Sequence, residues 1–418
     1  MISQPLHKQH YSLDHEAFLD VLTHHENLLI IQDLDGVCME LVRDPLTRKI
    51  SPDYVNATQR FKGHFFVLTN GEHVGRRGVN RIVDKALGNT KKTSYLPGLA
   101  AGGVQWQTQN GKVSHPGISD AEIIFLAQIP SRAKQFLGEF IGQNIPSMTP
   151  AKRTYLIEAS VLDNFVSPTI NLNIFAETLQ TNRKLYEKLQ RAIAEFFDDL
   201  LAKAAELNLS ESFFVHYAPN LGRDQSGKEI VRFATDTDSG TTDFQFMLKG
   251  AVKEAGVPVL LNHYYYQQTG KYPLGENFNA RQAPQTNVEL LQLIKNNFDP
   301  KLMPLIVGVG DTITGSVEEG VVRRGGSDRL FLQLIQKIGI WASRGNIVTY
   351  VDSSGGELQN RKPLQLGEAN GKTKVIRGVT DAEDPLQINV AFPGGHREYT
   401  EVFMAAAQQR QSKLQALI

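Results

Sequence analysis

The most constraining feature of this chain is an apolar run that ends in two closely spaced carboxylates. Residues 28–37 read LLIIQDLDGV, so a strand over the first five would place Asp33 and Asp35, two positions apart, on one face. The carboxyl ends of the strands in an open α/β sheet form its ligand-binding edge. One carboxylate there can attack a phosphoryl group while the other acts as general acid and base. An Asx turn that closes a strand is the alternative explanation for the same residues.

Two further apolar runs end in a similar way. The run Phe65–Leu68 is followed by Thr69 and Asn70, and the run Leu305–Gly310 is followed by Asp311. A threonine hydroxyl and the amides of a turn can bind phosphate oxygens, although a threonine can also simply cap a strand. A third carboxylate adds the hard oxygen ligand that Mg²⁺ prefers. The sequence therefore predicts one phosphoryl-transfer site at the ends of three strands.

The predicted elements alternate between strands and helices. Further strands are expected at Asn346–Val351 and Leu386–Phe392. Helix-spaced apolar residues predict three helices, at Val288–Asn297, Arg329–Ile338 and Glu398–Leu417. This alternation predicts the α/β class, with a Rossmann-like parallel sheet flanked by helices.

The length of 418 residues predicts two domains. The segment after Thr69 contains an expected helix at Asn182–Leu207 and expected strands near Thr154–Glu158 and Phe213–Tyr217. We expect it to form an inserted α+β cap domain over residues 71–237. The core would then comprise residues 1–70 and 238–418, with the acidic stretch 236–243 as the returning hinge.

The charge balance favours a small-molecule partner. Lys+Arg and Asp+Glu number 44 each, which argues against a nucleic-acid binder and against a polybasic membrane-surface protein. Cys38 is the single cysteine, so no intrachain disulfide can form. The sequence contains neither a signal-peptide pattern nor an apolar run long enough to span a bilayer. We therefore expect a soluble, cytoplasmic protein that binds neither nucleic acid nor membranes.

The strand endings resemble those of the haloacid dehalogenase superfamily of aspartate-nucleophile phosphotransferases. The shared features are D-x-D-G-V after the first strand, T-N after the second and G-D after a later one. The resemblance implies that Asp33 is the nucleophile and a metal ligand, and that Asp35 is the general acid and base. It also implies that Thr69 binds phosphate, together with the Asn70 turn, and that Asp311 binds Mg²⁺ alongside Asp33 and the backbone carbonyl of Asp35.

The superfamily also uses a basic residue to bind the transferring phosphoryl group. Lys249 lies in a K-G-A-V stretch that looks like the helix start of sugar-phosphate phosphatases with a cap in this position. Arg281 precedes the helix that leads to the Asp311 strand, where other branches carry their lysine. An extra strand-like run at Pro258–Tyr265 lengthens the first pattern, so both candidates stay open, with Lys249 ranked first.

The third motif departs from the superfamily pattern. Members often carry another acidic residue four or five positions after the G-D aspartate, where this chain has Gly315 and Ser316. The further metal ligand is therefore left open, with Thr312, a backbone oxygen and water as the alternatives.

Over almost its full length the chain resembles one family, the salt-tolerance phosphatases that act on glucosylglycerol phosphate. The stretches 32–39, 67–73 and 308–317 carry this resemblance. It implies Mg²⁺-dependent hydrolysis of 2-O-glucosylglycerol 3-phosphate, the last step of compatible-solute synthesis in salt acclimation. It also leaves room for a complex with glucosylglycerol-phosphate synthase.

Three other functions are compatible with the same motifs. A related phosphatase acting on trehalose phosphate or sucrose phosphate would share the core residues and differ in its cap. A phosphomutase could use the same aspartates. A non-catalytic scaffold would need neither Asp33 nor Asp35, so their presence argues against it.

Overall fold

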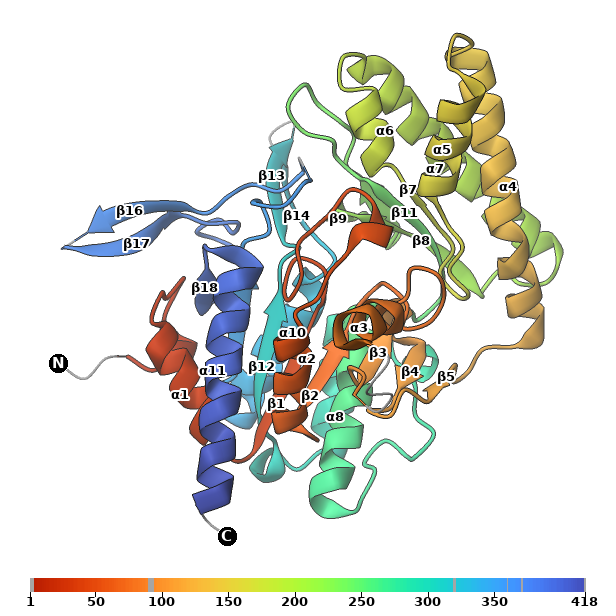
Figure 1. Cartoon of the computed structure of the whole chain (residues 1–418). Helices are drawn as coiled ribbons and strands as arrows, with labels where there is room; N and C mark the ends of the chain where they lie inside the picture. Colours follow the sequence, from red (N-terminus) through yellow and green to blue (C-terminus); the bar gives the residue numbers. More distant parts are fainter. Residues whose placement is uncertain (1–3, 89–93, 319–320, 359, 370, 417–418) are drawn as a thin grey trace.

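The computed structural model describes residues 4–88, 94–318, 321–358, 360–369 and 371–416. Its centre is an eight-stranded sheet in the order β18-β15-β12-β1-β2-β3-β4-β5 (Figure 1). The first six strands in that order pair in parallel, and the last two add an antiparallel edge. The strands are β1 (Leu28–Gln32), β2 (Phe65–Leu68), β3 (Gly98–Ala100), β4 (Gln105–Gln107), β5 (Val113–Ser114), β12 (Leu305–Gly310), β15 (Ile347–Val351) and β18 (Val390–Phe392). The predicted parallel α/β core is thereby confirmed.

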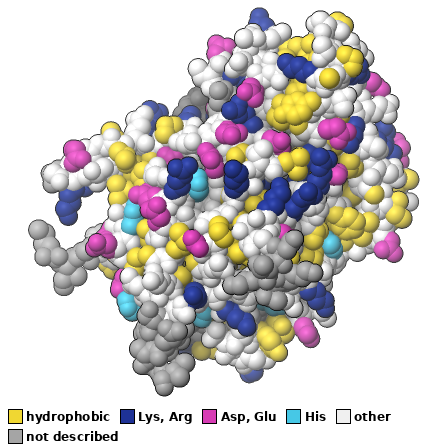
Figure 2. All heavy atoms as spheres, in the orientation of Figure 1, with side chains coloured by type: hydrophobic (Ala, Val, Ile, Leu, Met, Phe, Trp, Pro, Cys, Tyr) yellow, Lys and Arg dark blue, Asp and Glu magenta, His cyan; other side chains and the backbone are white. Residues whose placement is uncertain are grey.

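A second, smaller sheet belongs to the cap, which lies above and to the right of the core in Figure 1. Its order is β6-β7-β11-β8 and its pairings are antiparallel. The strands are β6 (Val161–Leu162), β7 (Thr169–Asn171), β8 (Phe213–Ala218) and β11 (Asp243–Leu248), and the helices are α4 (Asp120–Asn144), α5 (Pro150–Ser160), α6 (Asn173–Thr178) and α7 (Arg183–Glu206). Lys and Arg side chains gather along the boundary between cap and core on the face shown in Figure 2.

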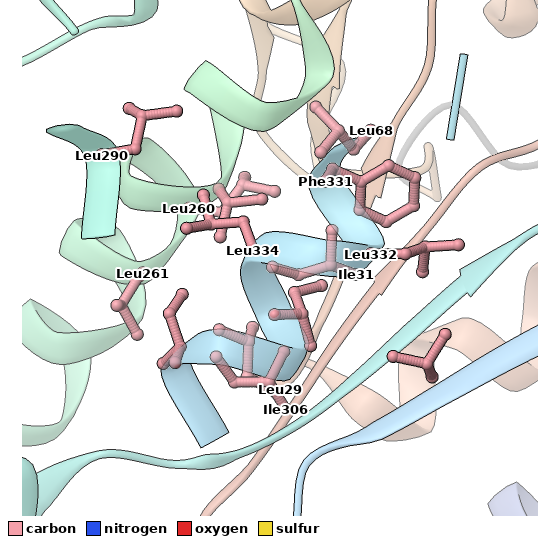
Figure 3. Close-up of a cluster of buried hydrophobic side chains, with 14 of the residues drawn as sticks. Leu29, Ile31, Leu68, Leu260, Leu261, Leu290, Ile306, Phe331, Leu332 and Leu334 are labelled. Carbon is pink, nitrogen blue, oxygen red and sulfur yellow. The ribbon is translucent and has the colours of Figure 1, made fainter. Parts of the chain in front are cut away.

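Helices cover both faces of the core sheet. Its central strands are therefore buried on both sides. One face packs against α8 (Lys253–Thr269), α9 (Asn287–Asn297) and α10 (Arg329–Ala342). Figure 3 shows Leu29 and Ile31 of β1 in this cluster with leucines of those helices. The other face packs against α1 (His15–His24), α2 (Pro52–Thr58), α3 (Val79–Leu87) and α11 (Gly395–Ala416).

Three hairpins project from this framework. They are β9 (Asn220–Arg223) with β10 (Glu229–Val231), β13 (Thr314–Glu318) with β14 (Val321–Gly325), and β16 (Gln365–Ala369) with β17 (Lys372–Arg377). The β16–β17 hairpin extends away from the core on the left of Figure 1. Within the described residues, no helix combines the length and the hydropathy required to cross a bilayer.

The sheet pairings place both domain boundaries at positions that differ from the predicted ones. Residues 71–114 do not belong to the cap, because β3 extends the core sheet beside β2 and is followed there by β4 and β5. Residues 243–248 do not belong to the core, because β11 pairs with β7 and β8. The acidic stretch 236–243 therefore leads into a cap strand rather than back to the core.

Two predicted strands are helices. Thr154–Glu158 lies within α5, which Thr149 caps and Pro150 begins. Pro258–Tyr265 lies within α8, whose residues are buried over most of its length. A short apolar run can belong to a buried helix or to a strand, and its periodicity alone cannot distinguish them.

Candidate active site

The carboxyl ends of three adjacent strands bring the predicted motif residues together. Asp33 follows β1, Thr69 follows β2 and Asp311 follows β12. Because β1 pairs in parallel with both β2 and β12, these ends meet at one edge of the sheet. All three side chains are buried. This part of the predicted constellation is therefore present as a single site.

Three carboxylates at this edge form a compact cluster. Asp33, Asp311 and Asp328 each place an oxygen within 4.8 Å of the others. Asp328 immediately precedes α10, and its Oδ2 accepts hydrogen bonds of 2.9 Å from the backbone N–H groups of Asp311 and Thr312. The cluster consists of hard oxygen donors, which are the ligands that Mg²⁺ prefers.

Asp328 lies 17 residues after Asp311, well beyond the four or five positions that the superfamily pattern predicts for another acidic residue. The expected spacing after Asp311 fails because the β13–β14 hairpin is inserted between the two residues. The hairpin returns the chain to its starting point, where the backbone N–H of Asp328 donates to the carbonyl of Thr312 at 3.1 Å. No signal of regular spacing remains in the sequence to identify Asp328.

A lysine that was not predicted joins the carboxylates. Lys253, the first residue of α8, places its Nζ 2.6 Å from Asp33 Oδ2 and 2.6 Å from Asp328 Oδ1. Burial opposes its charge, but the two carboxylates raise the Lys253 pKa above its ordinary value. Burial also raises the pKa of Asp33 to about 7, and Lys253 acts in the opposite direction. One cation therefore balances part of a concentrated negative charge.

Neither predicted basic residue contacts the cluster. Lys249 is exposed and pairs with Glu211. Arg281 pairs with Glu122 at 2.5 Å, at the start of α4. Lys249 lies outside α8, four residues before the helix begins at Lys253. No sequence signal singles out Lys253, because its burial at the start of α8 is a consequence of tertiary structure.

Asp35 lies outside the three-carboxylate cluster and pairs with an arginine. Its Oδ2 is 2.8 Å from Nη1 of Arg48. A second arginine, Arg361, donates from Nη2 to Thr312 Oγ1 at 3.2 Å, and its Nε lies 3.7 Å from Asp311 Oδ2. Neither arginine was predicted, because both come from loops with no recognisable pattern. They add positive charge where an anionic substrate would bind.

The side chain of Asn70 points to the cap. Its amide lies 2.8 Å from Nε2 of His216 on β8, and the opposite nitrogen of His216 pairs with the buried Glu229 at 2.9 Å. This contact connects core and cap. Since the Asn70 side chain is engaged there, only its backbone N–H is left for the expected role in phosphate binding.

A cavity of about 140 Å³ lies between the core carboxylates and the cap sheet. From the core it is lined by Asp33, Asp35, Thr69, Asn70, Arg48, Lys253, Thr312 and Arg361, and from the cap by Asn164, Asn171, Asn173, Asp243 and Gln245, among others. The cavity thus offers carboxylates and cations on the core side, and amides and one carboxylate on the cap side.

The chain is similar to one curated protein at high identity. The chain is 58% identical over 414 residues to glucosylglycerol-phosphate phosphatase from Synechocystis sp. (strain ATCC 27184 / PCC 6803 / Kazusa), covering 97% of this chain and 98% of that protein. Two solved structures are more distantly similar. The trehalose-6-phosphate phosphatase C-terminal domain from C. albicans is 11% identical with a TM-score of 0.46, and trehalose-6-phosphate phosphatase from Aspergillus fumigatus is 10% identical with a TM-score of 0.38. In both pairs, 96% of this chain and 99% of the other are covered.

The family model for glucosylglycerol-phosphate phosphatase matches residues 27–407, which include every motif described above. The chain therefore belongs to the glucosylglycerol-phosphate phosphatase family.

Proposed function

We propose that this chain hydrolyses 2-O-glucosylglycerol 3-phosphate to glucosylglycerol and phosphate through an aspartyl-phosphate on Asp33. The observation that carries the proposal is the placement of Asp33 beside Lys253, in one cavity with Asp35 and Thr69. Family membership supports the substrate.

A divalent cation fits the carboxylate cluster. Three buried carboxylates are countered by Lys253 and by Arg361, whose Nε lies 3.7 Å from Asp311 Oδ2, so the cluster keeps an excess of negative charge. Asp311 Oδ2 is buried and has no hydrogen-bond partner among the residues described. Mg²⁺ held by Asp33, Asp311 and Asp328 would supply positive charge next to the equatorial phosphoryl oxygens.

In the first step, a carboxylate oxygen of Asp33 attacks phosphorus in line with the leaving oxygen. A bond forms between Asp33 and phosphorus as the bond to the substrate oxygen breaks. Protonated Asp35 gives its proton to that oxygen, so the sugar leaves as a neutral alcohol. Lys253 both orients Asp33 and offsets the charge of the phosphoryl group.

In the second step, Asp35 takes a proton from water, and the resulting nucleophile attacks the phosphorus of the aspartyl-phosphate. The bond between phosphorus and Asp33 breaks, which releases inorganic phosphate and restores the carboxylate. Arg48 holds the Asp35 side chain through its 2.8 Å contact. A phosphate dianion that enters the cavity competes for Arg48 and thereby frees Asp35 to act.

Release of inorganic phosphate from three substrates tests this function. Wild type and Asp33→Asn are assayed with glucosylglycerol 3-phosphate, trehalose 6-phosphate and sucrose 6-phosphate, in Mg²⁺ or EDTA. We expect the first substrate to be preferred, with activity lost in Asp33→Asn and in EDTA. A preference for another sugar phosphate would contradict the substrate while keeping the mechanism, and no release from any substrate would favour the scaffold alternative.

The family resemblance also supports a cytoplasmic location and a complex with glucosylglycerol-phosphate synthase. We propose both as extensions of the same function. Co-purification of the two proteins from a lysate, with and without cross-linking, tests the complex.

A further inference from the structure

Strand β11 of the cap sheet has an apolar face and, in its first half, a polar face. On β11, Phe244, Phe246 and Leu248 are buried in the apolar cluster of the cap. Because successive side chains of a strand point to opposite faces, Asp243 and Gln245 lie on the other face. Both line the cavity that Asp33 and Asp35 line from the core. The polar face of β11 is therefore turned toward the reacting groups.

Neighbouring cap residues extend this polar face. Asn171 on β7 is the direct cross-strand partner of Asp243, and its Nδ2 donates to Asp243 Oδ1 at 2.8 Å. Asn173 starts α6 two residues later, and its backbone N–H donates to Asn171 Oδ1 at 3.1 Å. Asn171 and Asn173 line the same cavity. The sequence around β7 and β11 thus places three amides and a carboxylate opposite Asp33.

Two of these amides have unmet hydrogen bonds. Asn173 and Gln245 are 5% and 9% exposed, yet Asn173 Oδ1 and Gln245 Oε1 have no hydrogen-bond partner in the described part of the chain. A buried polar group without a partner is destabilising, and in native proteins such a group is usually satisfied by a protein group, an ordered water or a bound ligand. Burial also raises the pKa of Asp243 to about 6, so this carboxylate is held in a position that disfavours its charge.

We propose that Asp243, Gln245 and Asn173 form a subsite that binds the hydroxyl groups of the substrate's sugar. The proposal rests on the proposed function, because it concerns the part of the substrate that leaves. A hydroxyl both donates and accepts, which matches amides and a carboxylate. The same set would repel a second phosphate, so a polyhydroxylated neutral group is the chemistry that fits.

The subsite favours substrates that carry a sugar, because the sugar hydroxyls provide hydrogen-bond partners for Asn173 and Gln245. When a substrate lacks the sugar, it provides no hydrogen-bond partners for the amides of Asn173 and Gln245, which penalises that substrate strongly. The core residues contact only the phosphoryl group of the substrate. Preference for a sugar phosphate over a sugar-free phosphate therefore resides on the cap face.

The test compares kcat/KM for a sugar phosphate with kcat/KM for glycerol 3-phosphate, which has the phosphate but no sugar. The variants are Asp243→Asn and Gln245→Leu. The matched controls, Asp199→Asn and Gln180→Leu, change exposed residues of the same types in the cap. We expect the ratio of the two kcat/KM values to fall at least about tenfold in each subsite variant and to stay within about twofold in the controls.

Circular dichroism melting curves identify any variant that does not fold, and Gln245→Leu decides if Asp243→Asn fails this check. A ratio equal to that of the wild type in a folded subsite variant overturns the subsite.

Failure of the subsite can be separated from failure of the proposed function. If the wild type prefers trehalose 6-phosphate or sucrose 6-phosphate, the glucosylglycerol assignment is wrong, and the same ratio measured with the preferred substrate still tests the subsite. A wild type that cleaves no sugar phosphate faster than glycerol 3-phosphate overturns the subsite directly.

Discussion

Lys253 Nζ and Asp33 Oδ2 are 2.6 Å apart at the junction of α8 and β1, and both side chains are buried. This pair joins the proposed nucleophile to the helix that follows the cap. A second contact of Lys253, 2.6 Å to Asp328, makes it the common partner of two of the three clustered carboxylates.

Replacing Lys253 by alanine should reduce kcat/KM by about 10³-fold, because the phosphoryl group and Asp33 lose their shared cation. The steady-state rate of phosphate release measures this effect. Lys249→Ala serves as the matched control and should stay within about twofold of the wild type, since Lys249 is exposed and pairs with Glu211. Full activity in Lys253→Ala together with a loss in Lys249→Ala would contradict this assignment.

Asp328→Asn should weaken the binding of Mg²⁺. Asp328 accepts two backbone N–H bonds that hold the Asp311–Thr312 turn, and an amide can replace only part of this arrangement. We expect the Mg²⁺ concentration for half-maximal activity to rise by about 10–100-fold. Asp381→Asn, which changes an exposed carboxylate paired with Arg324, is the control. An unchanged Mg²⁺ requirement in Asp328→Asn would exclude Asp328 from the metal site.

The turn between Asp35 and Val37 depends on glycine for two reasons. Gly36 has a φ of +81°, and a Cβ added to it would lie 2.3 Å from Asp311 Oδ2. Gly36→Ala should therefore displace Asp311 and lower activity by at least about tenfold. The substitution also introduces backbone strain of about 1 kcal/mol, which is a separate effect. Gly275→Ala isolates that strain, because Gly275 has a φ of +90° with no atom within 4 Å of the added Cβ. Equal activity in the two variants would rule out the steric argument.

His73 should make stability depend on pH. It is buried among the Gly98 carbonyl, Gln105 and Gln107, and burial lowers its pKa from 6.5 to about 4. Above pH 6.5 the histidine is neutral in both the folded and unfolded states, so its protonation does not reduce the free energy of unfolding. As the pH falls from 6.5 toward 4, the unfolded state takes up a proton that the folded state excludes, and up to about 3 kcal/mol is lost.

Urea unfolding of wild type and His73→Gln at pH 7 and pH 5 measures this contribution. The wild type should lose more unfolding free energy than the variant between the two pH values. An equal loss in both proteins would mean that another group dominates the acid sensitivity.

The parts of the site that follow from local sequence were predictable. Asp33, Thr69 and Asp311 each terminate a buried apolar run, and parallel strands must end at a common edge. Lys253 and Asp328 depend on tertiary structure instead. Lys253 was missed because α8 was taken for a strand, and Asp328 because a hairpin separates it from Asp311.

The domain boundaries were misplaced for a related reason. Short strands such as β3 and β11 contain no signal that says which sheet they join. Only their pairing partners, β2 in the core and β7 and β8 in the cap, assign them. Sequence periodicity reports that a strand is buried, and long-range pairing decides where.

The measurement that tests the account most directly is the capture of the covalent intermediate. The wild type is mixed with glucosylglycerol 3-phosphate carrying a labelled phosphate and Mg²⁺, quenched in acid within milliseconds, digested and analysed by mass spectrometry. The account predicts the label on the peptide that contains Asp33, and no label in Asp33→Asn. Rapid turnover by Asp33→Asn, or label on a different residue, would contradict it.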